Sequence, residues 1–263
     1  MRRRRGSMVW WLVFALAVLY FFLPLVATLD FSLKAQPAFA AYTNSLKDPK
    51  FLTSLLYSLI VGVLTITASL ALIVPTAYWV HLRVPRARSL VEFITLLPFV
   101  IPAVVLVFGL IRVYSRPPLP FTHSDLGSTA LLVFGYVVLS LPYMYRAVDT
   151  GLRSIDVRSL TEAAQSMGAG WLTILWRIIL PNLRVALLSG AFLTLAIVLG
   201  EFTIASFLAR PAFGPYLNVL SQSKAYEPAA VALISFGLTW LAMIVIAILG
   251  RDTRTRIEIG GAH

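Results

Sequence analysis

The chain has 263 residues, of which 59% are hydrophobic and 13% charged, and its formal net charge is +11. Soluble domains carry about 25% charged residues, so this composition excludes an ordinary soluble enzyme and indicates a multi-pass membrane protein. Cysteine is absent, which excludes disulfides, thiol catalysis and cysteine-based metal sites. The basic residues lie in short segments beside apolar runs, as membrane topology requires, and this placement argues against nucleic-acid binding.

Six apolar runs follow one another along the chain, and each has roughly the length that a helix needs to cross about 30 Å of hydrocarbon. The sequence therefore predicts an all-α membrane protein with a single transmembrane domain over residues 1–263. The first run is longer than the roughly 7–15 apolar residues of a signal peptide, so we expect a retained helix. The predicted spans cover residues 8–29, 51–80, 91–114, 128–145, 185–208 and 229–249.

The basic residues predict the topology of these spans. Arginines gather at the N-terminus, in the connection after the second span, in segment 146–184 and in the C-terminal tail, whereas the lysines lie in the alternate connections. Basic residues are enriched on the cytoplasmic side of membranes. Both termini and segment 146–184 are therefore predicted to be cytoplasmic.

Two prolines, Pro98 and Pro102, interrupt the third predicted span. Each removes a backbone donor, so we expect the helix to kink there. Such a kink can open a polar patch along a translocation pathway, although more often it only bends a packed helix. Both interpretations stay open from the sequence.

Segment 156–181, between the fourth and fifth spans, lacks a membrane-length apolar run. Asp156 is a favourable N-cap for a short helix, and Gly168-Ala169-Gly170 then breaks that helix. A second helix is expected to begin near Trp171 and to end before Pro181, because the residue preceding proline disfavours helical torsions. The apolar face of the first helix is expected to carry Ile155, Leu160, Ala163, Ala164 and Met167.

Glu162 in this segment has two interpretations. Ser159-Leu160-Thr161-Glu162 matches a capping box, in which the carboxylate only accepts a hydrogen bond from a backbone N–H. Alternatively, two short helices around a glycine corner form a compact knob, and the acid contacts a groove of another protein.

The wider pattern of this segment is E-A-A-x3-G-x9-I-x-L-P, and its fixed positions are Glu162, Ala163, Ala164, Gly168, Ile178, Leu180 and Pro181. It resembles the cytoplasmic EAA loop of permease subunits of binding-protein-dependent ABC importers with the type I (MetI-like) fold. The resemblance is specific over 156–181 and looser over 51–249. It implies a six-span permease of the bacterial inner membrane whose fixed loop residues couple it to an ATPase.

The resemblance also implies partners. These are two cytoplasmic ABC ATPase subunits, a second permease subunit (a heterodimer rather than a homodimer) and an extracytoplasmic solute-binding protein. ATP and magnesium would bind to the ATPases. The chain itself lacks a G-x-x-x-x-G-K motif, so we expect no cofactor, no metal site and no enzyme activity in it. Gly170 departs from the family pattern, which often has a single glycine, and predicts a looser corner.

Glu201 lies inside the fifth predicted span, where a lone charge costs about 2.5–3.5 kcal/mol on insertion scales. It must face protein or water, either lining the translocation pathway or serving as a hydrogen-bonded structural carboxyl. Gly200-Glu201-Phe202 looks similar to permeases for polyamines, iron, thiamine or oxyanions. The first substrate expectation is a polyamine, spermidine or putrescine, because Glu201 and expected external acids could attract cations.

Other solutes and another class of transporter remain open. External lysines oppose the polyamine expectation, and iron(III), thiamine or a phosphonate would suit the same machine. An ion-coupled secondary transporter would usually show more spans or an inverted repeat, and more intramembrane charges than Glu201 alone.

Overall fold

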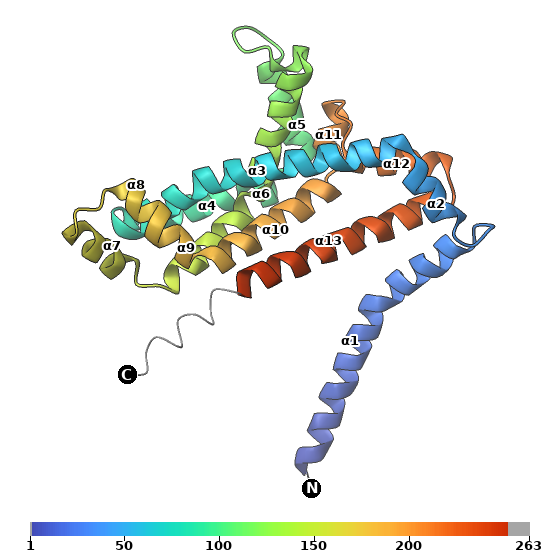
Figure 1. The fold of residues 1–263 in the computed structure, drawn as a ribbon, viewed down its shortest axis with the longest axis horizontal. Helices are drawn as coiled ribbons and strands as arrows, with labels where there is room; N and C mark the ends of the chain where they lie inside the picture. Colours follow the sequence, from blue (N-terminus) through green and yellow to red (C-terminus); the bar gives the residue numbers. More distant parts are fainter. Residues whose placement is uncertain (1, 252–263) are drawn as a thin grey trace. The chain divides into compact units, whose positions relative to one another are not determined.

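The computed structural model describes residues 2–251, and all regular elements in that part of the chain are helical (Figure 1). The predicted C-terminal tail beyond Arg251 lies outside the described residues. The helices are α1 (Arg2–Leu33), α2 (Ala40–Lys47), α3 (Pro49–Leu82), α4 (Arg88–Val100), α5 (Ala103–Tyr114), α6 (Asp125–Arg153), α7 (Val157–Ser166), α8 (Trp171–Ile174), α9 (Leu180–Asn182), α10 (Arg184–Gly200), α11 (Thr203–Phe207), α12 (Phe213–Ser223) and α13 (Glu227–Arg251). Short 3-10 turns cover Pro85–Ala87 and Phe121–His123, and a π-helical turn covers Leu175–Ile179.

The chain divides into two compact units. One comprises residues 2–52 with 216–241, and the other comprises 53–215 with 242–251. In the first unit a small core joins Ala35, Ala41 and Ala230, and the Ser32 and Tyr42 hydroxyls are hydrogen-bonded at 2.7 Å. Most apolar side chains of α1 are exposed, which suits a helix in lipid, where an apolar surface needs no other cover.

Three helical stretches are each long and apolar enough to cross a membrane: Trp10–Leu33, Pro49–Leu82 and Asp125–Arg153. They correspond to the first, second and fourth predicted spans. Two bent pairs pass the same test, Pro85–Val100 with Ala103–Tyr114 and Trp171–Asn182 with Arg184–Gly200. The sixth predicted span falls within α13, whose shorter apolar stretch Glu227–Leu241 is described. Six spans and cytoplasmic termini therefore stay predictions.

The third predicted span is broken rather than gently kinked. Pro98 stays inside α4, whereas Pro102 immediately precedes α5 and has extended torsions (φ −60°, ψ 143°). The axes of the two halves differ by 100°. The kink predicted from the prolines is confirmed, and Pro102 is the residue that marks it.

The fifth predicted span is wrong as a single helix over 185–208. Helix α10 ends at Gly200, Glu201 is extended (φ −78°, ψ 128°), and the chain resumes as the short α11. The apolar pattern continues through this break, so hydropathy alone did not show it.

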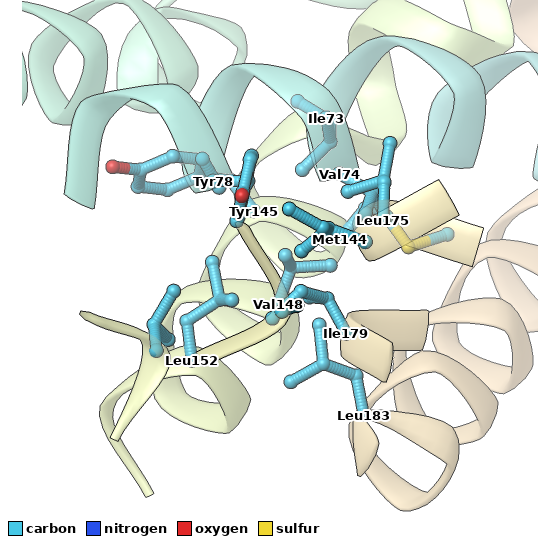
Figure 2. Close-up of a cluster of buried hydrophobic side chains, with 14 residues drawn as sticks. Ile73, Val74, Tyr78, Met144, Tyr145, Val148, Leu152, Leu175, Ile179 and Leu183 are labelled. Carbon is cyan, nitrogen blue, oxygen red and sulfur yellow. The ribbon is translucent and has the colours of Figure 1, made fainter. Parts of the chain in front are cut away.

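The larger unit has a core that joins α3, α6 and the segment from α7 to α9. Figure 2 shows Ile73, Val74 and Tyr78 of α3 packed with Met144, Tyr145, Val148 and Leu152 of α6, and with Leu175, Ile179 and Leu183. Close approach of α6 and α10 adds to this packing. A Cβ on Gly151 would lie 2.6 Å from the Ala186 Cβ, and one on Gly190 would lie 2.7 Å from the Met144 sulfur. These helices are therefore held close by small residues, as is common in membranes.

Candidate functional site: the loop between α6 and α10

The start of α7 is fixed by Asp156. Its Oδ1 accepts a hydrogen bond from the Ser159 backbone N–H at 3.1 Å, and the Ser159 hydroxyl donates to its Oδ2 at 2.6 Å. The hydroxyl bond, and then the backbone bond, hold the pKa of Asp156 below its ordinary value. The predicted N-cap is confirmed. Because α7 begins at Val157, Glu162 lies well inside the helix, and the capping-box interpretation is wrong.

The Glu162 side chain is 62% exposed. Its Oε1 accepts a hydrogen bond from Arg158 Nε at 2.8 Å, one helical turn earlier, and this bond raises the pKa of Arg158. A surface pair of this kind contributes little to stability. The carboxylate is therefore accessible to a partner.

The corner after α7 depends on Gly168, whose φ is +80°. The Gly168 N–H donates to Gln165 O at 2.9 Å, and the Ala169 N–H donates to Ala164 O at 3.0 Å. These bonds satisfy the last carbonyls of the helix, as a left-handed C-terminal glycine commonly does. Gly170 has ordinary extended torsions (φ −73°, ψ 161°) before α8. The second glycine therefore adds no left-handed residue to the corner, and the torsions give no support to the expected looseness.

The face by which α7 packs agrees only in part with the expected one, because Ile155 and Ala164 pack on the core but Ala163 and Met167 do not. Val157, Thr161 and Ala164 are buried, whereas Ala163 is exposed and Met167 is 80% exposed. Thr161 can be buried because its hydroxyl donates to Val157 O at 2.7 Å. The same hydroxyl lies 3.3 Å from that of Tyr78. The knob, defined as residues 156–170, is thus anchored on α3 and α6 by one face and presents the other.

The second half of the loop runs through α8, the π-helical turn and α9. Ile178 and Leu180 pack partly buried against the core that also contains Ala164. Pro181 lies near the end of the continuous helical stretch Trp171–Asn182, after the π-helical turn. The expected helix end before Pro181 is wrong, since helical torsions continue to Asn182. The axis then changes by 79° at Leu183 before α10 begins.

Glu201 lies at the break between α10 and α11. Its two carboxylate oxygens each accept from the Ile204 N–H at 3.0 Å, and Oε2 accepts from the Ala205 N–H at 3.4 Å. The backbone at Gly214 lies close to this break, because a Cβ on Gly214 would overlap the Glu201 carbonyl. In this structure the carboxylate caps the start of α11, which is a form of the hydrogen-bonded structural role considered from the sequence.

The predicted site residues fall into two regions of the larger unit. The seven positions of the EAA pattern lie on the loop between α6 and α10, on or beside one core. Pro98 lies inside α4. Pro102 immediately precedes α5, and Glu201 lies two residues before α11. Helices α5 and α11 meet in a second core that contains Val107 and Ile204. The seven positions therefore share one loop, and their role in coupling stays a prediction.

An ionic cluster escaped the sequence analysis. Asp149 of α6 is buried, and it contacts His81, Arg88 and Arg153, while Glu92 also accepts from both arginines. The four-residue spacings of Arg88–Glu92 and Asp149–Arg153 are a local signal for ion pairs. The contacts across helices join residues far apart in the sequence and had no such signal. Among the described residues, no group of three or more His, Cys, Asp or Glu side chains could hold a metal ion.

Residues 73–255 match the model of the family described as "Binding-protein-dependent transport system inner membrane component". The chain belongs to this family. It is a permease subunit of an ABC importer, a membrane transport component without an ATPase site of its own. The predicted all-α permease fold and the inner-membrane location are confirmed.

Curated relatives carry several transport names. The chain is 28% identical over 244 residues, 89% of its length and 87% of the relative's, to a "Probable molybdenum ABC transporter permease protein" of Haloferax volcanii. It is 31% identical over 125 residues to the spermidine/putrescine permease PotC of Escherichia coli K12. That second match covers 46% of this chain and 47% of PotC, so the chain matches less than half of that relative's length.

The fold is similar to that of a solved transporter. A chain in the crystal structure of a bacterial alginate ABC transporter, in complex with an alginate pentasaccharide-bound periplasmic protein, gives a TM-score of 0.68 at 17% identity. The match covers 97% of this chain and 98% of that chain. At this identity the likeness shows the fold alone.

Proposed function

We propose that this permease couples solute passage to ATP hydrolysis on separate subunits through the loop over 156–181. The observation that carries the proposal is the two-sided knob. Its buried side chains Val157, Thr161 and Ala164 join the core of α3 and α6, while Glu162 and Met167 face outward. A rigid element fixed on one face and exposed on the other can transmit displacement from a docked protein into a helical bundle.

The proposal names the partners that such a machine requires. Two cytoplasmic ABC ATPases bind ATP and magnesium. Glu162 and Ala163 lie on the exposed face of α7 that contacts them, while Ala164, on the buried face, holds this docking helix on the core. Gly168 makes the corner, and Ile178, Leu180 and Pro181 join the knob to α10. A second permease, different from this chain, completes the pathway, and an extracytoplasmic solute-binding protein delivers the solute, as the periplasmic protein in the alginate transporter complex suggests.

A small charged solute is the proposed substrate, with a polyamine as the first candidate. The match to PotC and the acids Asp30, Asp48, Asp125 and Glu227 support a cation. An oxyanion is the second candidate, because the relative matched over 89% of this chain is named for molybdenum. The Glu201 carboxylate already accepts hydrogen bonds from a backbone N–H group, so it is less available to bind a cation, and this favours the second candidate.

Uptake by the whole complex tests the coupling. Glu162→Ala and Gly168→Pro should leave the chain inserted, yet lower ATP-dependent uptake of labelled spermidine or molybdate by at least about fivefold, the lower end of usual coupling energies. Glu162→Ala removes the exposed carboxylate, and Gly168→Pro is incompatible with the positive φ. The measurement is initial uptake in proteoliposomes, normalised to inserted permease.

Two neighbouring substitutions serve as controls. Gln165→Ala changes another exposed side chain of α7, and Gly170→Ala adds a methyl group where torsions are ordinary and space is open. Both should retain uptake. Full uptake by the Glu162 and Gly168 variants would contradict the role of the loop, and uptake driven by an ion gradient without ATP would favour a secondary transporter.

A further inference from the structure

The ionic cluster around Asp149 links three helical elements of the larger unit. His81 Nε2 lies 2.8 Å from Asp149 Oδ1, Arg88 donates to both carboxylate oxygens at 3.2 and 3.1 Å, and Arg153 Nε donates to Oδ2 at 2.9 Å. Glu92 Oε1 accepts from Arg88 at 3.0 Å and from Arg153 at 3.4 Å. The end of α3, the start of α4 and the end of α6 are thereby joined through one carboxylate.

Burial makes this junction hard to separate. The Asp149 side chain is 9% exposed and that of His81 is 16% exposed. The arginines are more accessible, with Arg88 33% and Arg153 53% exposed. Separating them from the buried carboxylate is nevertheless costly, because its charge is left without compensation. When the end of α6 moves, α4 must therefore follow, or Asp149 must exchange one partner for another.

The knob contacts α3 and α6 next to this junction. Thr161 of α7 meets Tyr78, which lies one turn before His81 on α3. Leu152, in the same core as Val157 and Ala164, lies one turn after Asp149 on α6. Displacement of the knob therefore reaches both helices next to the charged cluster. From there α4 leads to the 100° bend at Pro102.

A buried hydroxyl next to the cluster is available as an alternative partner. Tyr145 precedes Asp149 by one helical turn, so the two side chains share a face. The Tyr145 side chain is 4% exposed, and its hydroxyl has no hydrogen-bond partner within the described part of the chain. An unsatisfied buried hydroxyl is unusual and calls for an explanation.

We propose that Asp149 is a positioning residue for energy coupling, and that its carboxylate exchanges a cationic partner for the Tyr145 hydroxyl when the knob moves. This inference rests on the proposed function of the loop. The Tyr145 hydroxyl has no partner in the present structure, and in the second conformation it donates to Asp149. The exchange lets α6 shift against α4 without leaving the carboxylate uncompensated.

Tyr145→Phe in the complete transporter tests the exchange. The substitution removes a hydroxyl that makes no bond in this structure, so a purely structural role predicts unchanged or improved assembly. The exchange predicts normal assembly and ATP hydrolysis, but import at least about fivefold lower. The number of ATP molecules hydrolysed per solute imported therefore rises. Asp149→Asn is expected to raise the same ratio.

Tyr143→Phe is the matched control, because Tyr143 lies on the same helix with its ring against Phe99, 5.4 Å between centroids. It should leave the ratio unchanged. Wild-type import by Tyr145→Phe, or an equal loss of import and ATP hydrolysis, would overturn the exchange. If Asp149→Asn fails to assemble, import by the Tyr145→Phe complex still tests the partner exchange. Failure of the proposed function is distinct, since the wild-type complex would then import without ATP.

Discussion

Glu201 shows how one residue can satisfy a sequence prediction in an unexpected way. A carboxylate within an apolar run must meet protein or water, and the sequence left a pathway role and a structural role open. In the structure its oxygens accept from the Ile204 and Ala205 N–H groups. Backbone donors at a helix start are a local answer to the cost of burying a charge. The role in the pathway stays a prediction.

Substitutions that separate charge from capping decide between the two roles of Glu201. Glu201→Gln keeps an oxygen that can accept from Ile204, so a capping role predicts import within about twofold of wild type. Glu201→Leu removes the acceptor, and loss of a cap costs about 0.5–2 kcal/mol, so import should fall clearly. The measurement is the initial import rate per assembled complex. Equal damage by Gln and Leu would show that the charge itself is required.

At the scale of elements, α7 separates what local sequence determines from what packing determines. Its N-cap at Asp156 and its glycine end at Gly168 depend on neighbouring residues and were predicted. Its buried face was predicted only in part. Ala164 is buried as expected, whereas Thr161 is buried because its hydroxyl is satisfied on Val157 O and can then pack against Tyr78. The broken spans at Pro102 and Glu201 also differ in whether the sequence could predict the break. Proline is visible in the sequence, whereas capping by a glutamate is not.

Contacts between α6 and α10 allow a direct test of element packing. Gly151→Ala places a methyl group 2.6 Å from the Ala186 Cβ, which cannot rotate away, so we expect destabilisation by about 1–3 kcal/mol. Gly109→Ala in α5 is the control, because its added methyl meets nothing within 4 Å. Thermal unfolding in detergent measures both. A Gly151 variant as stable as the Gly109 variant would contradict the close approach of α6 and α10.

For the whole molecule, the sequence predicted the class of fold and the position of the loop between α6 and α10 more fully than the contacts between distant segments. Apolar runs and a spaced motif are linear features, and the fold class that they predicted agrees with the permease family. The Asp149 cluster joins residues 61 and 68 positions apart, and no linear pattern encodes such a meeting. Two compact units also follow from contacts rather than from composition.

Co-purification from the native membrane is the most direct measurement of the central claim, that this permease works through its exposed loop with a separate ATPase. The full chain, tagged and extracted in mild detergent, should bring with it an ATPase containing a phosphate-binding loop and a second permease chain. Glu162→Ala should reduce recovery of the ATPase, while Gln165→Ala should not. A chain recovered alone, or only with copies of itself, that still moves solute in liposomes without ATP would contradict the account.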